Sequence, residues 1–378
     1  MADVLREEVV EPVDVGPTVA TILATQLDSG MIPWFAGGHA DPWNHVEAAM
    51  ALCSAGELAA AGAALEWLAH TQSPDGSWHA RYSGDGCVEE RRIDTNGVAY
   101  VATGVLGYLL AGGDAGFAGE MFAVVERALG FVVAATAPSG AIPWSIDPGG
   151  RPAAFSLLAA SSSIYQSLSS GVRLAASLGL ERPGWEAAAA RVGRLVAGRE
   201  TYFADNSQFA MDWYYPALVG ALEPETAAGR IDERWSEFVI GGRGVRCVSH
   251  RPWVTAAETA ECAIALASIG RRDEAVDLLA WARQHRLPDG SYVTGLVYPQ
   301  GSSYPPAERS SYTAAAIVLA EDALSGLSPA AQLFVDGSLP RGLDLDPTDA
   351  PASRLSTRRL PVPAEASSTN SPSLSARL

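Results

Sequence analysis

The sequence predicts an all-α protein folded as an (α/α)6 toroid, in which six inner helices are surrounded by six outer ones. Three observations support this prediction: long alanine-rich runs, few β-branched stretches, and one turn motif that occurs twice. The motif reads Gln72-Ser-Pro-Asp-Gly-Ser-Trp78 and, more than two hundred residues later, Gln284-His-Arg-Leu-Pro-Asp-Gly-Ser-Tyr292. Such a distant copy indicates an internal repeat. Each copy is typical of an outer helix that ends in an Asp-Gly turn and is packed by an aromatic ring.

The helices follow one another in pairs, with a repeat of roughly fifty residues. Glycine or proline marks many of the joints between them, as at Gly56, Gly113, Gly179 and Gly270. The twelve predicted ranges are about 42–55, 58–72, 94–112, 115–136, 156–179, 182–199, 208–222, 225–239, 254–270, 272–286, 308–324 and 328–335. An open superhelical array of helix pairs is the alternative architecture.

Three regions follow from this pattern. Residues 1–30 form an N-terminal extension with room for an extra helix at about 17–28, and residues 31–338 form the toroid. Residues 339–378 are rich in Pro, Ser, Thr and Arg and poor in large apolar residues. Such a segment cannot bury enough apolar surface to offset the entropy of ordering, so we predict a disordered tail.

Composition limits the function classes. The 378-residue chain has a net charge of −17 and a pI near 4.7, which argues against binding nucleic acid or an anionic membrane surface through charge. Its four cysteines are scattered without paired spacing, as in a reducing compartment. The N-terminus lacks signal-peptide features and no apolar stretch has transmembrane length. We therefore predict a cytoplasmic protein without membrane insertion, and the oligomeric state stays open.

Polar residues gather where the inner helices begin. If the inner helices run parallel, these starts meet at one mouth and create an aromatic-walled site with several carboxylates, suited to a small-molecule substrate. The candidate catalytic residues are Glu258, Asp212, Asp94 and Glu47. The candidate substrate-binding residues are Trp43, His45, Trp213, Tyr214, Trp253, Tyr312, Glu261 and Glu308.

Structural roles compete with these assignments. Asp41 and Asp94 sit where an aspartate commonly caps a helix, and Asp212 can stabilise a helix dipole at the surface. Glu258 and Glu261 instead lie three residues apart inside an alanine-rich run, so they share one helix face. Cys247 and His250 could begin a zinc site, but the further ligands are not evident nearby. We predict no metal and no cofactor.

The turn motif, together with six helix pairs, resembles the repeat of squalene-hopene cyclases and protein prenyltransferase β subunits. The phrases Asp41-Pro-Trp-Asn-His-Val-Glu47, Met211-Asp-Trp-Tyr-Tyr215 and Arg246-Cys-Val-Ser-His-Arg-Pro-Trp-Val-Thr255 are similar to actinobacterial prenyltransferase-like proteins. The resemblance covers about residues 30–335 and implies the α/α toroid of the terpenoid cyclase and protein prenyltransferase superfamily. It also implies acid-initiated chemistry on an isoprenoid-like or other hydrophobic substrate.

Three functions therefore remain open. In a cyclase, the rings of Trp43, Trp213, Tyr214 and Trp253 would stabilise carbocations, and Glu258 or Asp212 would supply the proton. In a carbohydrate-active (α/α)6 enzyme of the glycoside hydrolase type, two carboxyl groups would act as acid and base beside indole platforms. A non-catalytic toroid would use the same mouth only to bind a ligand.

Overall fold

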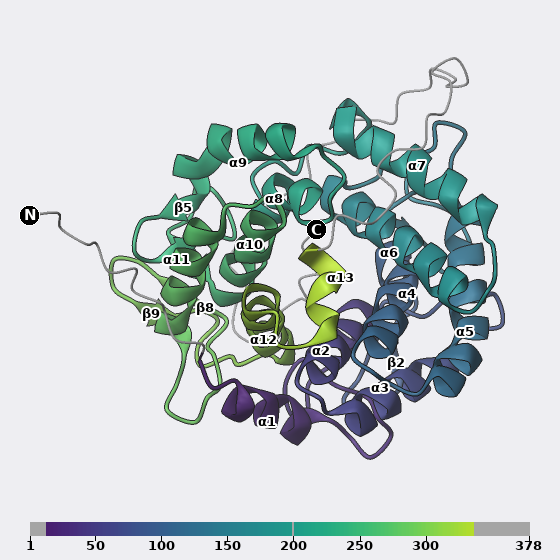
Figure 1. Ribbon diagram of the computed structural model, residues 1–378, viewed down its shortest axis with the longest axis horizontal. Helices are drawn as coiled ribbons and strands as arrows, with labels where there is room; N and C mark the ends of the chain where they lie inside the picture. The colour runs from purple at the N-terminus through teal and green to yellow at the C-terminus, as the bar shows by residue number, and fades with distance from the viewer. Residues whose placement is uncertain (1–12, 199, 336–378) are drawn as a thin grey trace, which may run out of the picture.

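The computed structural model describes residues 13–198 and 200–335, and these residues form two concentric rings of helices (Figure 1). Within the described chain, the inner ring consists of α2 (Pro42–Ser54), α4 (Thr95–Leu110), α6 (Leu158–Ser177), α8 (Ala210–Leu218), α10 (Ala256–Ser268) and α12 (Ser311–Ser325). Each inner helix packs against the next, and α12 packs against α2, so the inner ring closes on itself. The predicted all-α toroid is therefore confirmed, and the open array is excluded.

The outer ring surrounds the inner one, each outer helix packing on its inner partner (Figure 1). Its members in the described chain are α1 (Gly16–Thr25), α3 (Leu58–Thr71), α5 (Ala115–Ala134), α7 (Pro183–Gly198), α9 (Pro224–Phe238) and α11 (Arg272–Ala282). The inner helices have no solvent-facing side. In α10, for example, every residue from Ala256 to Leu266 is buried, and its small alanines let neighbours approach from all directions.

The sixth pair differs from the prediction. The outer place beside α12 is taken by α1, which packs against α12 and α2, whereas residues 328–335 had been assigned to that place. Those residues instead form the 3-10 turn η3 (Pro329–Ala331) and the short helix α13 (Gln332–Val335). Helix α13 lies inside the ring and contacts α4, α10 and α12 (Figure 1). Its Leu333 packs near Gly107, in the last part of α4, so α13 covers the end of the barrel opposite the mouth.

One turn ends four of the outer helices in the described chain, α1, α3, α5 and α11. Each copy contains a glycine with a φ between +86° and +94°, at Gly30, Gly76, Gly140 and Gly290. In each, the amide three residues before the glycine donates to the carbonyl of the residue after it, at 2.8–2.9 Å. A Cβ on Gly76 would overlap the Arg127 backbone of α5, and one on Gly290 would overlap Pro17 of α1. These glycines let successive outer helices pack closely, and they place α1 after α11 in the outer ring.

Short strands and turns connect the helices. The strands are β1 (Arg81–Tyr82), β2 (Val88–Glu90), β3 (Ile93–Asp94), β4 (Ser145–Ile146), β5 (Val239–Ile240), β6 (Gly244–Val245), β7 (Trp253–Thr255), β8 (Gly295–Val297) and β9 (Ser302–Ser303). They pair antiparallel as β1–β2, β3–β4, β5–β6 and β7–β8–β9. Two further 3-10 turns are η1 (Glu200–Tyr202) and η2 (Arg283–His285). Among the described helices, none combines the length and apolar character needed to span a bilayer. The predicted tail, 339–378, lies outside the described residues.

Candidate active site

The same backbone hydrogen bond recurs just before the start of most inner helices. For five inner helices of the described chain, the residue two positions before the N-cap accepts an amide hydrogen bond from an earlier strand or turn. The donor–acceptor pairs are Trp34 to His39, Ala80 to Arg92, Trp144 to Phe155, Cys247 to Trp253 and Thr294 to Glu308, at 2.6–3.1 Å. We call these five acceptor residues the rim. The first residues of α12, α4 and α10 each donate an amide hydrogen bond to the segment that precedes the next inner helix, from Ser311 to Trp34, from Thr95 to Trp144 and from Ala256 to Thr294. The starts of these helices therefore lie at one end of the barrel, and the inner helices run parallel.

Two aspartates form the next level below the rim. Asp41 caps α2, where its carboxylate accepts from the backbone amide of Asn44 at 3.0 Å and also from the Asn44 side chain. Asp94 caps α4 through the amides of Asn96 and Gly97. Burial raises the pKa of Asp41. Burial also raises the pKa of Asp94 to about 6, with a smaller contribution from the charge of Asp41 and against the nearby Arg92. Asp41 and Asp94 can therefore cap their helices and still exchange a proton.

One helical turn deeper than the two aspartates lie Asn44, Asp212 and Glu258, each three residues after the N-cap of its helix. Asp212 accepts from the backbone amide of Ala159 at 3.1 Å and so links α8 to the start of α6. Glu258 differs from the others. Its side chain is 1% exposed, yet neither carboxylate oxygen has a hydrogen-bond partner within the described chain. A buried carboxyl group without a partner is costly, so a bound ligand or water is its natural complement.

A floor of acids and tyrosines closes the barrel beneath Glu258. Tyr100 donates to Glu47 at 2.5 Å, and Glu261 accepts from Tyr312 at 2.6 Å and from Tyr214. Burial raises the pKa of Glu47 to about 7, although the hydrogen bond from Tyr100 opposes this. Burial, reinforced by the charge of Glu47, raises the pKa of Glu261 well above its usual range. These residues satisfy one another, which makes them a supporting layer under the mouth.

Several other buried polar atoms at the mouth resemble Glu258 in lacking partners. In the part of the chain that the structure describes, the atoms without a hydrogen-bond partner at the starts of α2, α4, α8 and α10 are Trp34 Nε1, His39 Nε2, Asn44 Oδ1, Arg92 Nη1, Asn96 Oδ1, both amide atoms of Asn206, Thr255 Oγ1 and both oxygens of Glu258. Buried polar groups in folded proteins are nearly always hydrogen-bonded. Donors and acceptors that converge without partners are what a hydroxyl-rich ligand would satisfy.

Aromatic rings line the same end of the barrel. Trp43 stacks on Tyr100 with ring centroids 5.2 Å apart, and Tyr312 lies 5.7 Å from Trp34 and 5.4 Å from Trp43. Trp253 belongs to the rim, where its indole nitrogen donates to the carbonyl of Tyr304 at 2.9 Å. The rings of Trp34, Trp43, Tyr100 and Tyr312 connect the rim to the floor along the α12–α2–α4 side, whereas Trp253 precedes α10.

Glu308 also lies on the rim, where its carboxylate accepts from Thr294 Oγ1 at 3.0 Å. It is half-buried.

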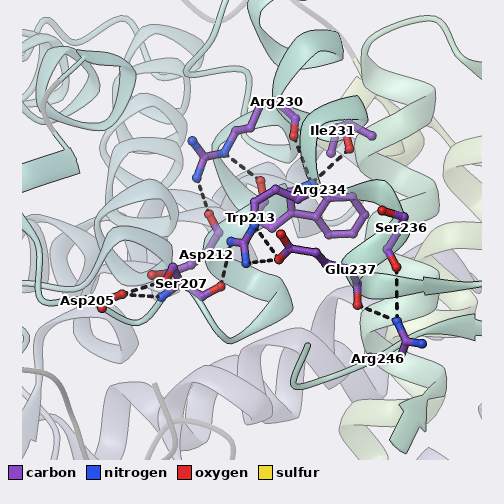
Figure 2. Close-up of polar contacts among 10 residues, drawn as sticks. All are labelled: Asp205, Ser207, Asp212, Trp213, Arg230, Ile231, Arg234, Ser236, Glu237 and Arg246. Atoms are coloured by element: carbon purple, nitrogen blue, oxygen red, sulfur yellow. Dashed lines mark hydrogen bonds and ion pairs between the residues drawn. The ribbon is translucent and has the colours of Figure 1, made fainter. Parts of the chain in front are cut away.

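Two predicted binding residues point away from the mouth. His45 lies between α2 and α3, where Nδ1 accepts from the Ile32 amide at 3.0 Å and Nε2 donates to the Ala64 carbonyl at 2.8 Å. Burial lowers its pKa to about 4. Trp213 turns outward toward α9, and its indole nitrogen donates to backbone carbonyls of Arg230 and Ile231, as Figure 2 shows. Both side chains hold an inner helix to an outer one, so we do not retain them in the proposed site.

Sequence reasoning missed several mouth residues. His39, Arg92 and Asn206 precede the helices in loops, where no periodicity assigns a side chain to a face. The signal that could have found them is the repeat itself, because the position two residues before each N-cap recurs around the ring. No group of three or more His, Cys, Asp or Glu side chains suited to a metal ion occurs in residues 13–198 and 200–335.

Comparison with known proteins relates this arrangement to carbohydrate enzymes. No family model matches the sequence. The chain is 45% identical, over 336 residues, to the MMP endo-(1,4)-3-O-methyl-alpha-D-mannosidase of Mycolicibacterium hassiacum, covering 89% of this chain and 93% of that protein. Among solved structures, it is similar to a wild-type glycosidase, with a TM-score of 0.65, 16% identity and coverage of 83% of this chain and 96% of that one. A D-mannose isomerase gives a TM-score of 0.63 at 12% identity, covering 81% and 95%.

The structural likenesses show the fold, and the 45% identical relative shows the family. The resemblance to terpenoid cyclases and protein prenyltransferases is therefore wrong, and so is the isoprenoid cyclase or transferase chemistry inferred from it. The turn motif behind that resemblance recurs at the ends of outer helices, where its glycines pack against neighbouring outer helices, and it reports on packing rather than reaction. The carbohydrate-active alternative is the one that the relative supports. The chain belongs to the enzyme family of the MMP endo-(1,4)-3-O-methyl-alpha-D-mannosidase.

Proposed function

We propose that this protein is an endo-acting glycosidase that hydrolyses α-linked mannosyl residues, including methylated ones, within a neutral oligosaccharide or polysaccharide. The observation that carries the proposal is Glu258, a buried carboxyl group without a partner in the described chain, at the end of the barrel that also holds Asp94 and Asp41. A glycosidase needs two carboxyl groups, one to protonate the leaving oxygen and one to activate water or attack the sugar. The net charge of −17 is compatible with a neutral glycan.

The two catalytic roles follow from the environments of the carboxyl groups. A pKa of about 6 lets Asp94 hold a proton near neutral pH, so we assign it as the general acid that protonates the glycosidic oxygen. Glu258 then acts as the base that removes a proton from the attacking water. Their helices, α4 and α10, are separated by α6 and α8 on one side and by α2 and α12 on the other. This opposite placement leaves room for a water molecule and favours inversion at the anomeric carbon.

The unpartnered groups around the pair supply the binding contacts. Asn206, Asn44 and Asn96 offer amide groups to sugar hydroxyls, and Trp34 offers its indole N–H. Trp43 provides apolar ring surface and is backed by Tyr312 of the floor. Glu47 and Glu261 have tyrosine partners, so we assign them to the supporting floor rather than to catalysis. Asp212 is engaged by the Ala159 amide and helps to shape the wall.

The test is hydrolysis of an α-(1→4)-linked oligomannoside carrying 3-O-methyl groups, with products separated by chain length and the new anomer followed by NMR. Internal cleavage that disappears in Asp94→Asn and Glu258→Gln supports the proposal. If Asp41→Asn abolishes cleavage while Asp94→Asn does not, the acid role belongs to Asp41. Absence of any cleavage of mannosides by the wild-type protein contradicts the proposed function.

We also expect the enzyme to act in the cytoplasm. None of its four cysteines forms a disulfide in the described chain, and Cys53, Cys247 and Cys262 are buried as small apolar residues. Fractionation of the native host, with detection of the untagged protein, tests this expectation.

A further inference from the structure

We propose that Trp144, Phe155 and Arg92 form a second sugar-binding subsite at the rim, which holds a unit of the glycan chain away from the cleaved bond. The proposal rests on the proposed function, because it concerns how a chain longer than two sugars crosses the mouth. These three residues lie where the starts of α4 and α6 meet, beside Asp94. Trp144 and Phe155 have no part in the catalytic assignment, and Arg92 enters it only through its charge, which lowers the pKa of Asp94.

The segment that carries Trp34 is repeated within the chain. The sequence Gly30-Met-Ile-Pro-Trp34 returns as Gly140-Ala-Ile-Pro-Trp144. Both copies dock on the first residue of a neighbouring inner helix through the same two hydrogen bonds. In the first copy, Ser311 donates from its amide to Trp34 O at 2.8 Å and from its hydroxyl to Pro33 O at 2.7 Å.

In the second copy, Thr95 donates from its amide to Trp144 O at 3.2 Å and from its hydroxyl to Pro143 O at 2.7 Å. Trp34 is thus held on α12, and Trp144 is held on α4. Trp34 precedes α2 and therefore lies where α12 and α2 meet, and Trp144 precedes α6 and lies where α4 and α6 meet. In the ring order α12, α2, α4, α6, the helices capped by Asp41 and Asp94, α2 and α4, thus lie between the two tryptophans. A glycan that runs from one tryptophan to the other passes both aspartates.

A second ring stacks on each of the two tryptophans. His39 stacks on Trp34 with ring centroids 6.2 Å apart and an interplanar angle of 10°. Phe155 stacks on Trp144 at 5.6 Å and 27°. His39 and Phe155 occupy the same rim position, because each accepts the amide hydrogen bond of its tryptophan. The second copy therefore repeats the aromatic pair of the first with an apolar ring in place of the histidine.

The second copy lacks the acidic N-cap residue of the first. The residue two positions after His39 is Asp41, whereas the residue two positions after Phe155 is Leu157, and both are N-caps. The second copy thus keeps the paired rings but has no acid at the equivalent position. This combination suits binding without bond cleavage.

The chemistry of the three side chains fits a neutral, partly methylated sugar. Trp144 and Phe155 are half-buried, whereas Trp34 is buried, so ring surface remains available at the second copy. Pyranose C–H faces and methyl ethers pack on such surface. The Arg92 guanidinium lies 4.6 Å from the Trp144 ring centre. Its Nη1 forms an ion pair with Asp94 Oδ2 at 3.9 Å but has no hydrogen-bond partner among the described residues. Arginine only donates hydrogen bonds, so it suits sugar hydroxyl and ether oxygens.

The test compares two substrates of different length on Trp144→Ala and Phe155→Leu. One is the shortest methylated oligomannoside that the wild-type enzyme cleaves, and the other extends it by several sugars in either direction. In the wild type, the longer chain is expected to have the lower KM. In each variant, the advantage of the longer chain in kcat/KM is expected to shrink about tenfold, as for loss of one aromatic contact. Circular dichroism and Tm identify any variant that fails to fold.

Trp281→Ala is the matched control, because Trp281 is a half-buried tryptophan on the outer helix α11. It is expected to keep the wild-type length preference. The subsite is disproved if folded Trp144→Ala and Phe155→Leu retain the wild-type preference for the longer chain, or lose the same factor on both substrates. Failure of the proposed function has a different signature, because the wild-type protein would then cleave neither substrate.

Discussion

Asp94 and Glu258 stand on opposite walls of the barrel mouth, since two inner helices lie between α4 and α10 in either direction around the described ring. Asp94 is held by backbone amides, whereas Glu258 has no partner in the described chain. One carboxyl group is therefore fixed by the fold, and the other is left for a ligand.

Glu258→Gln should abolish hydrolysis and leave the fold intact. We expect kcat to fall about 1,000-fold, because a catalytic carboxyl group is lost. No hydrogen bond of the described chain is removed, so Tm should not decrease. Glu321→Gln is the control, because Glu321 accepts from Arg283 at 3.0 Å near the end of α12 and should lose stability rather than activity. A lower Tm in Glu258→Gln, with activity retained, would assign Glu258 a structural role.

Asp41→Asn should move the alkaline limb of the pH profile to lower pH. The negative charge of Asp41 helps to raise the pKa of Asp94, and Arg92 opposes it. Without that charge, Asp94 loses its proton at lower pH, and activity that needs protonated Asp94 declines earlier as pH rises. The kcat/KM profile of the two proteins between pH 5 and 9 measures this shift. An unchanged alkaline limb argues against Asp94 as the acid.

Asn206→Leu should separate activity from stability. The side chain is 1% exposed, and neither amide atom has a partner within the described residues. An unsatisfied buried amide costs about 1–3 kcal/mol, so an apolar residue of similar size should maintain or raise Tm while kcat/KM falls. Thr18→Val is the control, since Thr18 donates to Gly290 O at 2.8 Å and should lose stability. A lower Tm in Asn206→Leu is the contrary result.

Glu47→Gln should change how stability depends on pH. Burial raises the pKa of Glu47 from 4.5 to about 7, so the folded state binds a proton that the unfolded state has lost over this range. The wild-type free energy of unfolding therefore falls as pH rises from 4.5 to 7, by about 3 kcal/mol from this group. The Glu47→Gln variant lacks this pH-dependent loss of stability, because glutamine does not titrate. Urea denaturation at pH 5 and pH 8 should show a smaller stability difference in Glu47→Gln, and equal differences in both proteins refute the assignment.

Gly76→Ala should destabilise the protein more than Gly56→Ala. Both glycines have positive φ, +94° and +80°, which costs an alanine about 1 kcal/mol. A Cβ at residue 76 would also overlap the Arg127 backbone, whereas one at residue 56 meets no atom within 4 Å among its neighbours. We expect an additional loss of about 1–3 kcal/mol at residue 76. Equal losses in thermal denaturation would mean that the turn does not fix the outer helices.

Much of the fold was predictable because local signals and global packing agree. Alanine-rich runs, glycine joints and the repeated turn each indicate helix pairs, and the structure uses the turn to space the outer helices. The sixth pair was not predictable in the same way. Ring closure by α1 depends on a contact with α12 that is distant in sequence, and residues 328–335 contain too few helical turns to cover an inner helix.

The site was harder to predict than the fold. Glu258 was identifiable because a carboxyl group in an alanine-rich run must face something other than apolar packing. His45 and Trp213 looked equivalent to their neighbours, and only the positions of α3 and α9 show that they face outward. The family inference failed for a related reason. The sequence lacks the Asp-x-Asp-Asp acid of squalene-type cyclases, and the shared turn is a property of the fold.

The contact between α2 and α12 sets an order for assembly on the ribosome. The first inner helix, α2, begins at Pro42 and emerges early. Its neighbour across the seam where the ring closes, α12, begins at Ser311, some 270 residues later. Until then, one flank of α2 has nothing to pack against, and rings such as Trp34 and Tyr312 cannot meet. A nascent chain therefore has no working mouth before α12 is released. A protein cut in two should regain hydrolysis only when both fragments are mixed and the seam is rebuilt.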